Sequence, residues 1–218
     1  MEKFKKACKW FFNSFIWLGL LLLIIDIVTK NVVVANKDYI LSQGANGIVL
    51  IPHFLAINYL INENIAFGIS LGSAATNRIV FSIIAILVSV GIIVYAVLKW
   101  GKIGKFYRAI LFMVLAGALG NVIDRLCYSA AYLDMNGEQG VVDWINFFGV
   151  WRFNFNIADS AIVVAAFMVI GAFIVEEVKD YKQKRAKQKS EEKVEDQEKV
   201  LSATEKEKIE LENKDKDE

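Results

Sequence analysis

The chain has 218 residues, of which 56% are hydrophobic, and this share exceeds what a soluble domain of that size needs for its core. Its formal net charge of +1 does not suggest a nucleic-acid partner, and the charges gather at the two ends of the chain and in one short loop. This composition favours a membrane protein over a soluble one.

Four segments are apolar enough and long enough to cross a membrane, because a span needs about 20 helical residues. They cover residues 10–28, 77–98, 106–123 and 158–178. Lysines precede the first segment, Lys and Arg surround the connection between the second and third, and a Lys-rich tail follows the fourth. The positive-inside rule therefore predicts cytoplasmic termini, with residues 29–76 and 124–157 forming two outer loops.

The first segment has an alternative interpretation as a cleaved signal peptide, in which the small residue Ala35 belongs to the cleavage site. A compact cleavage region should follow the apolar stretch directly, but Asp26, Thr29, Lys30 and Asn31 separate that stretch from Ala35. A retained helix is therefore the preferred interpretation.

The two outer loops carry signs of folded structure. The first contains the apolar run IVLIPHFLAINYLI at residues 48–61, which suggests a folded element at the membrane surface. The second contains a turn signal, MNGEQG, and then WRFNFN at 151–156, whose alternation of apolar and polar residues predicts a strand. We therefore expect an all-α membrane protein with four transmembrane helices and a small extracytoplasmic antiparallel β-sheet.

The residues after the fourth span form a separate charged segment. Residues 179–218 are dominated by Lys, Glu, Asp and Gln and have almost no aromatic side chains. We expect a cytoplasmic tail that extends the fourth helix and then becomes disordered, which leaves residues 1–178 as the membrane domain.

Polar residues mark the outer ends of three predicted helices. The first helix ends in DIVTK, the third in GNVIDR, and the fourth begins in FNIADSAI. The simpler interpretation is local: Asp26 and Lys30 form a boundary ion pair at i and i+4, and Asn156 with Asp159 caps a helix. Because ionisable groups at membrane depth are costly, carboxylates from three helices at one level also predict a functional site.

Two such carboxylates predict acid–base chemistry. Two aspartates held close in a poorly solvated site cannot easily ionise together, so one keeps a proton while the other is a base that can activate water. The single histidine, His53, is not part of an HExxH motif, so a zinc protease is unsupported and neither a metal nor a cofactor is expected. A serine–lysine protease using Ser70 or Ser73 has no motif support.

Five short motifs occur in order along the chain: DIVTK, NENIAF, GNVIDRL, VVDWINF and FNIADSAI. From about residue 10 to residue 178, this order and spacing resemble the lipoprotein signal peptidases, or signal peptidase II, the membrane aspartic proteases of bacteria. The resemblance implies an enzyme of the bacterial cytoplasmic membrane whose active site lies at the outer face. It would cleave prolipoproteins just before the cysteine that carries a diacylglyceryl group, in contact with membrane lipid, and we expect a monomer.

The resemblance also implies roles for individual residues. Asp124 in GNVIDRL and Asp159 in FNIADSAI match the catalytic positions, and Asp143 in VVDW competes for the role of second acid. The supporting or substrate-binding positions are matched by Asn121, Arg125, Asn156, Asp143, Asn62, Asp26 and Lys30. The chain departs from the family pattern in NENIAF, where Asn64 and Ile65 replace the usual Gly and Ala.

Two other functions remain open from the residues alone. A proton-coupled transporter would also contain intramembrane carboxylates, although here the acids gather at one boundary and no helix is broken near the midplane. A membrane scaffold would use its charged tail to recruit a partner.

Overall fold

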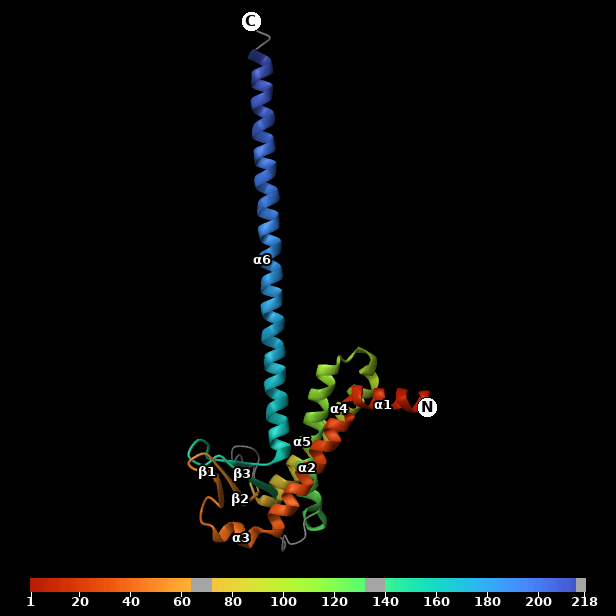
Figure 1. Ribbon diagram of the computed structural model, residues 1–218, viewed down its shortest axis with the longest axis vertical. Coiled ribbons are helices and arrows are strands. Elements are labelled where there is room, and N and C mark those ends of the chain that lie inside the picture. The colour runs from red at the N-terminus through yellow and green to blue at the C-terminus, as the bar shows by residue number, and fades with distance from the viewer. Residues whose placement is uncertain (64–71, 132–139, 215–218) are drawn as a thin grey trace. The chain divides into compact units, whose positions relative to one another are not determined.

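The computed structural model describes residues 1–63, 72–131 and 140–214 (Figure 1). The chain divides into two compact units, the first being Met1–Met168 and the second beginning at Val169. The first unit holds a small sheet and helices α1 to α5 together with the start of α6 (Ile157–Lys214), and the second holds the rest of α6.

Among the described residues, four helices are long and apolar enough to cross a membrane. They are α2 (Ile16–Ala35), α4 (Ala74–Lys99), α5 (Lys105–Ala131) and the first part of α6. A short helix, η2 (Trp100–Lys102), connects α4 to α5. The predicted four-span architecture is confirmed.

The first span differs from the predicted range of 10–28. A separate helix, α1 (Glu2–Ser14), precedes α2, and Phe15 breaks the two apart with a left-handed backbone at φ 63°. The apolar aromatic residues at the end of α1, directly before α2, explain why the span was predicted to begin at residue 10. At the other end, Asp26 and Lys30 suggested a boundary, but both are buried inside α2, where they pair.

The sheet contains β1 (Ile48–Ile51), β2 (Leu55–Asn62), β3 (Val141–Asn146) and β4 (Asn154–Phe155), hydrogen-bonded in that order. Every neighbouring pair is antiparallel. The first two strands come from the loop after the first span and the last two from the loop before the fourth, which confirms the predicted antiparallel sheet.

The strand predicted from WRFNFN is shorter than expected. Only Asn154 and Phe155 pair with β3, and Trp151 to Phe153 lie outside the ladder. The predicted turn at MNGEQG, and Asn64 and Ile65 of NENIAF, lie outside the described residues.

A small core attaches the sheet to the end of α2. It is built from Val33 and Val34 of α2, Ile40 of α3 (Lys37–Ser42) and Val142 of β3. Because side chains alternate along a strand, Val142 faces this core while Asp143 faces the opposite side. Figure 1 shows the sheet beside the C-terminal end of α2, away from α1.

Candidate active site

The polar residues predicted from the sequence form one connected cluster where α2, α5, α6 and the sheet meet. Its members are Asn62, Asp143, Asp26, Lys30, Asn121, Asp124, Arg125, Asn156 and Asp159. The cluster has two parts, an ion group sealed between the helices and a group of carboxyl and amide side chains beside a cavity.

Lys30 is the centre of the sealed group. Its Nζ lies 2.7 Å from Asp26 Oδ2 and 2.8 Å from Asp124 Oδ2, and all three side chains are at most 1% exposed. It also donates to Asn121 Oδ1 at 3.3 Å. A buried ammonium is costly unless it is paired and hydrogen-bonded, and here two carboxylates compensate it.

The two carboxylates of this group also bind backbone N–H groups of other elements. Asp124 Oδ2 accepts a hydrogen bond from Val142 N at 3.1 Å, which ties α5 to β3. Asp26 Oδ1 accepts one from Ala158 N at 2.9 Å, in the first turn of α6, where a negative charge is favourable. The sealed group therefore joins α2, α5, α6 and the sheet.

Two glycines of the GALGN run allow the helices to approach so closely. A Cβ on Gly120 would lie 2.5 Å from Asp26 Oδ2, and one on Gly117 would lie 2.5 Å from the carbonyl oxygen of Ala158. Since real Cβ atoms do not sit at such distances, only glycine fits these positions without a shift.

Asn156 and Asp159 form a reciprocal cap at the start of α6. Asn156 Oδ1 accepts from Asp159 N at 2.8 Å, and Asp159 Oδ2 accepts from Asn156 N at 3.4 Å. This is the arrangement of a capping box, with the acid at the third helical position. The local interpretation of these residues is thus correct, but it does not account for the Asn156 amide group.

The Asn156 amide and its neighbours position two further carboxyl groups. Asn156 Nδ2 donates to Asp143 Oδ1 at 2.7 Å, and Asn62 Nδ2 donates to Asp143 Oδ2 at 2.8 Å. Asn121 Nδ2 donates to Asp159 Oδ1 at 2.8 Å, and its Oδ1 accepts from Asn156 at 3.2 Å. One network of amides therefore orients both Asp143 and Asp159.

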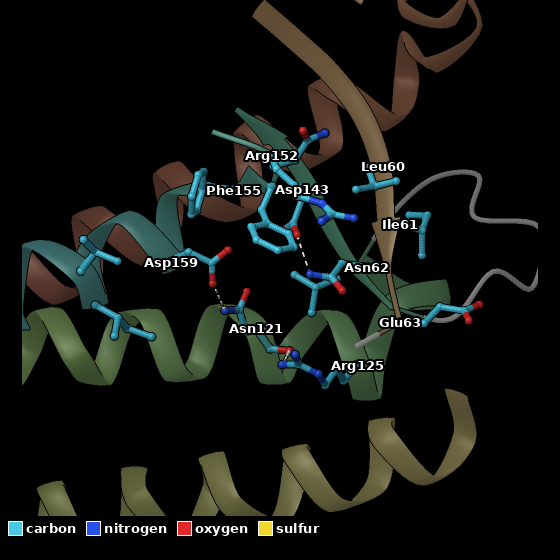
Figure 2. Close-up of a pocket in the computed structure, with 15 residues that line it drawn as sticks. Leu60, Ile61, Asn62, Glu63, Asn121, Arg125, Asp143, Arg152, Phe155 and Asp159 are labelled. Carbon is cyan, nitrogen blue, oxygen red and sulfur yellow. Dashed lines mark hydrogen bonds between the residues drawn. The ribbon is translucent and has the colours of Figure 1, made fainter. Parts of the chain in front are cut away.

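Asp143 and Asp159 face a cavity of about 580 Å³. Figure 2 shows Asp143 on β3 and Asp159 on α6 on one side of this space, with Asn121 and Arg125 of α5 below. Among the described residues, the lining consists of Leu60, Ile61, Asn62, Glu63, Asn121, Arg125, Val141, Asp143, Arg152, Phe153, Asn154, Phe155, Asp159, Ile162 and Val163. Apolar side chains with a few converging polar groups are typical of a binding site.

The environment of Asp143 favours its protonated form. Burial is the main cause that raises the pKa of this carboxyl above its ordinary value, and the nearby Asp159 carboxyl raises it further. The hydrogen bonds from Asn62 and Asn156 act in the opposite direction. The pair can therefore share one proton, as an acid–base mechanism requires.

Some but not all of the predicted site residues line the cavity. Asn62, Asn121, Arg125, Asp143 and Asp159 line it. Asn156 lies behind the lining as a positioning residue, and the ion group of Asp26, Lys30 and Asp124 is sealed away from it.

Four residues of the cavity were not predicted from the sequence: Arg152, and the apolar wall formed by Val141, Ile162 and Val163. Arg152 belongs to WRFNFN, and the alternation of apolar and polar residues in that motif is the sequence signal that could have pointed to it. Within the described residues, no group of three His, Cys, Asp or Glu side chains is placed to hold a metal ion.

Comparisons with known proteins identify the family to which the chain is similar. Residues 18–175 match the family model described as Signal peptidase (SPase) II. The lipoprotein signal peptidase of Fusobacterium nucleatum is 35% identical over 72% of this chain and 83% of its own length. That of Pseudoalteromonas translucida is 34% identical over 77% and 92%, and that of Staphylococcus aureus strain Newman 31% over 83% and 97%.

Solved structures give the same result. One bacterial membrane enzyme superimposes with a TM-score of 0.57 and 28% identity, covering 75% of this chain and 89% of its own. A second has a TM-score of 0.50 with 29% identity, over 72% and 92%. With its four apolar helices, its small antiparallel sheet and this match over most of its length, the chain belongs to the signal peptidase II family of membrane proteases.

Proposed function

We propose that the chain is an aspartic endopeptidase that removes the signal peptide from prolipoproteins, with Asp143 and Asp159 as its catalytic pair. The observation that carries the proposal is the placement of these two carboxyl groups beside one cavity, each oriented by asparagine amides. Family membership supports the protease over the transporter and the scaffold.

This proposal gives Asp124 a different role from the one that the resemblance suggested. Asp124 is fully buried, its Oδ2 lies 2.8 Å from the Lys30 ammonium, and it does not line the cavity. A catalytic carboxyl group must reach substrate, and a carboxylate paired with a buried lysine is a poor base. Asp124 therefore positions β3 through Val142 N, next to Asp143.

The mechanism follows from a pair that holds one proton. The ionised carboxylate removes a proton from a water molecule, whose oxygen attacks the peptide carbonyl carbon, while the protonated carboxyl donates its proton to the carbonyl oxygen. The tetrahedral intermediate collapses when one of its hydroxyl groups returns a proton to the carboxylate that had donated it. The C–N bond then breaks, and the leaving nitrogen receives the proton that the other carboxyl had taken from water. The pair again holds one proton, and its titration belongs to both residues.

The cavity wall suits a lipid-modified substrate. Phe153, Phe155, Ile162 and Val163 provide apolar surface beside the two carboxyl groups. We propose that cleavage occurs just before a cysteine carrying a diacylglyceryl group, whose chains remain in the bilayer beside α6. A monomer suffices for this, with the site at the outer face and the termini in the cytoplasm, as the lysine distribution favours.

The test is cleavage of a synthetic lipobox peptide, with and without the diacylglyceryl group, by the purified full chain in detergent. The Asp143→Asn and Asp159→Asn variants should each lose at least about 10³-fold in kcat/KM, because neither can complete the proton exchange. Both should still unfold cooperatively, at a temperature no lower than that of the parent, and still bind the uncleaved lipopeptide. The matched control is Asp38→Asn, which changes an exposed acid of α3 and should cleave normally.

Two results would contradict the proposal. Substantial cleavage by Asp143→Asn would remove that residue from the pair. Equal cleavage of lipidated and unlipidated peptide would refute the lipid requirement while leaving the acid pair intact.

A further inference from the structure

Helix α1 has two chemically distinct faces. At helical spacing, Phe4, Ala7, Cys8 and Phe11 share one face, while the lysines lie mainly on the other. On this face Phe4 is 73% and Phe11 36% exposed, and the adjoining Phe12 is 62% exposed. An isolated helix with such a face needs an apolar environment to cover it.

The break at Phe15 ends α1 and separates it from the first span, α2, which begins at Ile16. Ser14 is fully buried, and its Oγ accepts a hydrogen bond from Ile16 N at 3.2 Å. Trp17 Nε1 donates to the carbonyl oxygen of Phe12 at 3.0 Å across the break. Figure 1 shows α1 leaving the end of α2 that is remote from the sheet.

The α4–α5 connection holds α1 at this end. The rings of Trp10 and Trp100 lie 5.9 Å apart, and the Arg108 guanidinium lies 4.3 Å from the centre of the Trp100 ring. Arg108 Nη1 also donates to the carbonyl oxygen of Asn13 at 3.5 Å. Tryptophan and arginine at the end of a span are typical of the membrane–water boundary.

Charge gathers at the same boundary. The exposed lysines of α1 and of the α4–α5 connection are Lys3, Lys5, Lys6, Lys9, Lys99, Lys102 and Lys105. Few acidic residues offset these lysines in the sequence: residues 1–25 contain one, Glu2, and residues 74–123 contain no Asp or Glu.

We propose that α1 lies in the plane of the membrane surface and, with the α4–α5 connection, docks on anionic phospholipid headgroups of the leaflet opposite the candidate active site. Its aromatic face enters the headgroup and acyl boundary, and its lysines contact lipid phosphates. The site itself lies near the other end of α2, whose 20 residues extend about 30 Å. The inference is independent of the proposed catalytic pair.

Charge and continuity select lipid over a second copy of the chain. Two copies meeting through α1 would bring both sets of lysines together, and like charges repel. The apolar face, in contrast, continues directly into α2, a membrane-spanning helix.

The test measures the depth of α1 in vesicles by electron paramagnetic resonance. The full chain carries Cys8→Ser and Cys127→Ser, and a nitroxide is attached at Phe4→Cys or, as the opposite-face control, at Lys6→Cys. In phosphatidylcholine vesicles containing phosphatidylglycerol, the label at position 4 should collide with oxygen, and the label at position 6 with a water-soluble nickel complex.

Charge variants separate the electrostatic contribution. In the Phe4→Cys protein, changing Lys3, Lys5, Lys6 and Lys9 to Gln should raise the phosphatidylglycerol fraction needed for immersion at least about tenfold, while changing them to Arg should not. Thermal unfolding in detergent confirms that each variant is folded.

Three outcomes would overturn the inference. In the first, the label at position 4 stays accessible to the nickel complex in every vesicle. In the second, the label enters the membrane to the same depth whether or not phosphatidylglycerol is present, and equally in the Gln variant. The third is shielding from both oxygen and nickel, which would mean that protein covers this face.

Discussion

At the residue scale, the molecule contains two kinds of buried carboxyl group. Asp26 and Asp124 are paired with the Lys30 ammonium. In the described part of the chain, Asp143 and Asp159 receive hydrogen bonds from amide and backbone N–H groups and form no ion pair. We propose that the first kind stabilises the fold and that the second exchanges protons with substrate.

The Asp124→Asn variant tests the structural role of that residue. It should lower the free energy of unfolding by about 3 kcal/mol, because it leaves the buried Lys30 ammonium with one carboxylate. Thermal unfolding in detergent measures this, with Asp143→Asn as the matched comparison. An Asp124→Asn protein that is as stable as the parent but catalytically dead would instead favour a direct catalytic role for Asp124.

The raised pKa of Asp143 predicts how stability changes with pH. The folded state holds this proton more tightly than the unfolded chain, so stability falls as pH rises from the ordinary value of 3.8 towards the raised one. Once the pH exceeds the raised pKa of Asp143, the whole of this contribution to stability is lost. Asp143→Asn should therefore gain in unfolding temperature relative to the parent across this range, and a difference that does not vary with pH would contradict the shift.

At the element scale, the site depends on how closely three helices approach. Gly19 of α2 allows contact with the backbone of Phe112 on α5, and Gly120 of α5 allows contact with Asp26 and Ala158. Small residues at such positions let helices in a membrane pack backbone to backbone. Close packing brings Lys30 within reach of Asp124.

Gly120→Ala should disturb this packing. The new Cβ would lie 2.5 Å from Asp26 Oδ2 and push it away from Lys30, with an expected loss of about 1–3 kcal/mol in stability. The matched control is Gly91→Ala in α4, where a Cβ meets nothing within 4 Å. The control should be neutral or slightly stabilising in a thermal unfolding measurement. Equal stability of the two variants would refute the packing argument.

At the scale of the whole molecule, the candidate site and the family match both stop short of the charged tail. The match to the signal peptidase II family ends at residue 175, and the cavity lining ends at Val163. Among the described residues, none of the lining side chains comes from the second unit, which begins at Val169.

Removing the residues after Lys184 should therefore keep kcat/KM for the lipopeptide within about twofold of the full chain, since activity depends on the site. The measurement is the same cleavage assay in detergent. A large loss with an unchanged unfolding temperature would show that the tail takes part in substrate processing and would support the scaffold hypothesis.

The amino-acid sequence was sufficient to predict the four spans, the sheet built from two loops, and the cluster of polar residues. These depend on local properties: hydropathy over about 20 residues, and motifs such as GNVIDRL and FNIADSAI. It also predicted the cap at Asn156, because a capping box is a relation between residues three apart.

Only the tertiary structure decided where α2 begins and what surrounds each carboxyl group. Hydropathy could not separate α1 from α2, because their division depends on one left-handed residue, Phe15. Nor could it distinguish Asp124 from Asp143, since both follow apolar residues near the membrane boundary. That distinction depends on packing between distant segments: Lys30 of α2 approaches one carboxyl group, whereas Asn62 of β2 and Asn156 before α6 approach the other.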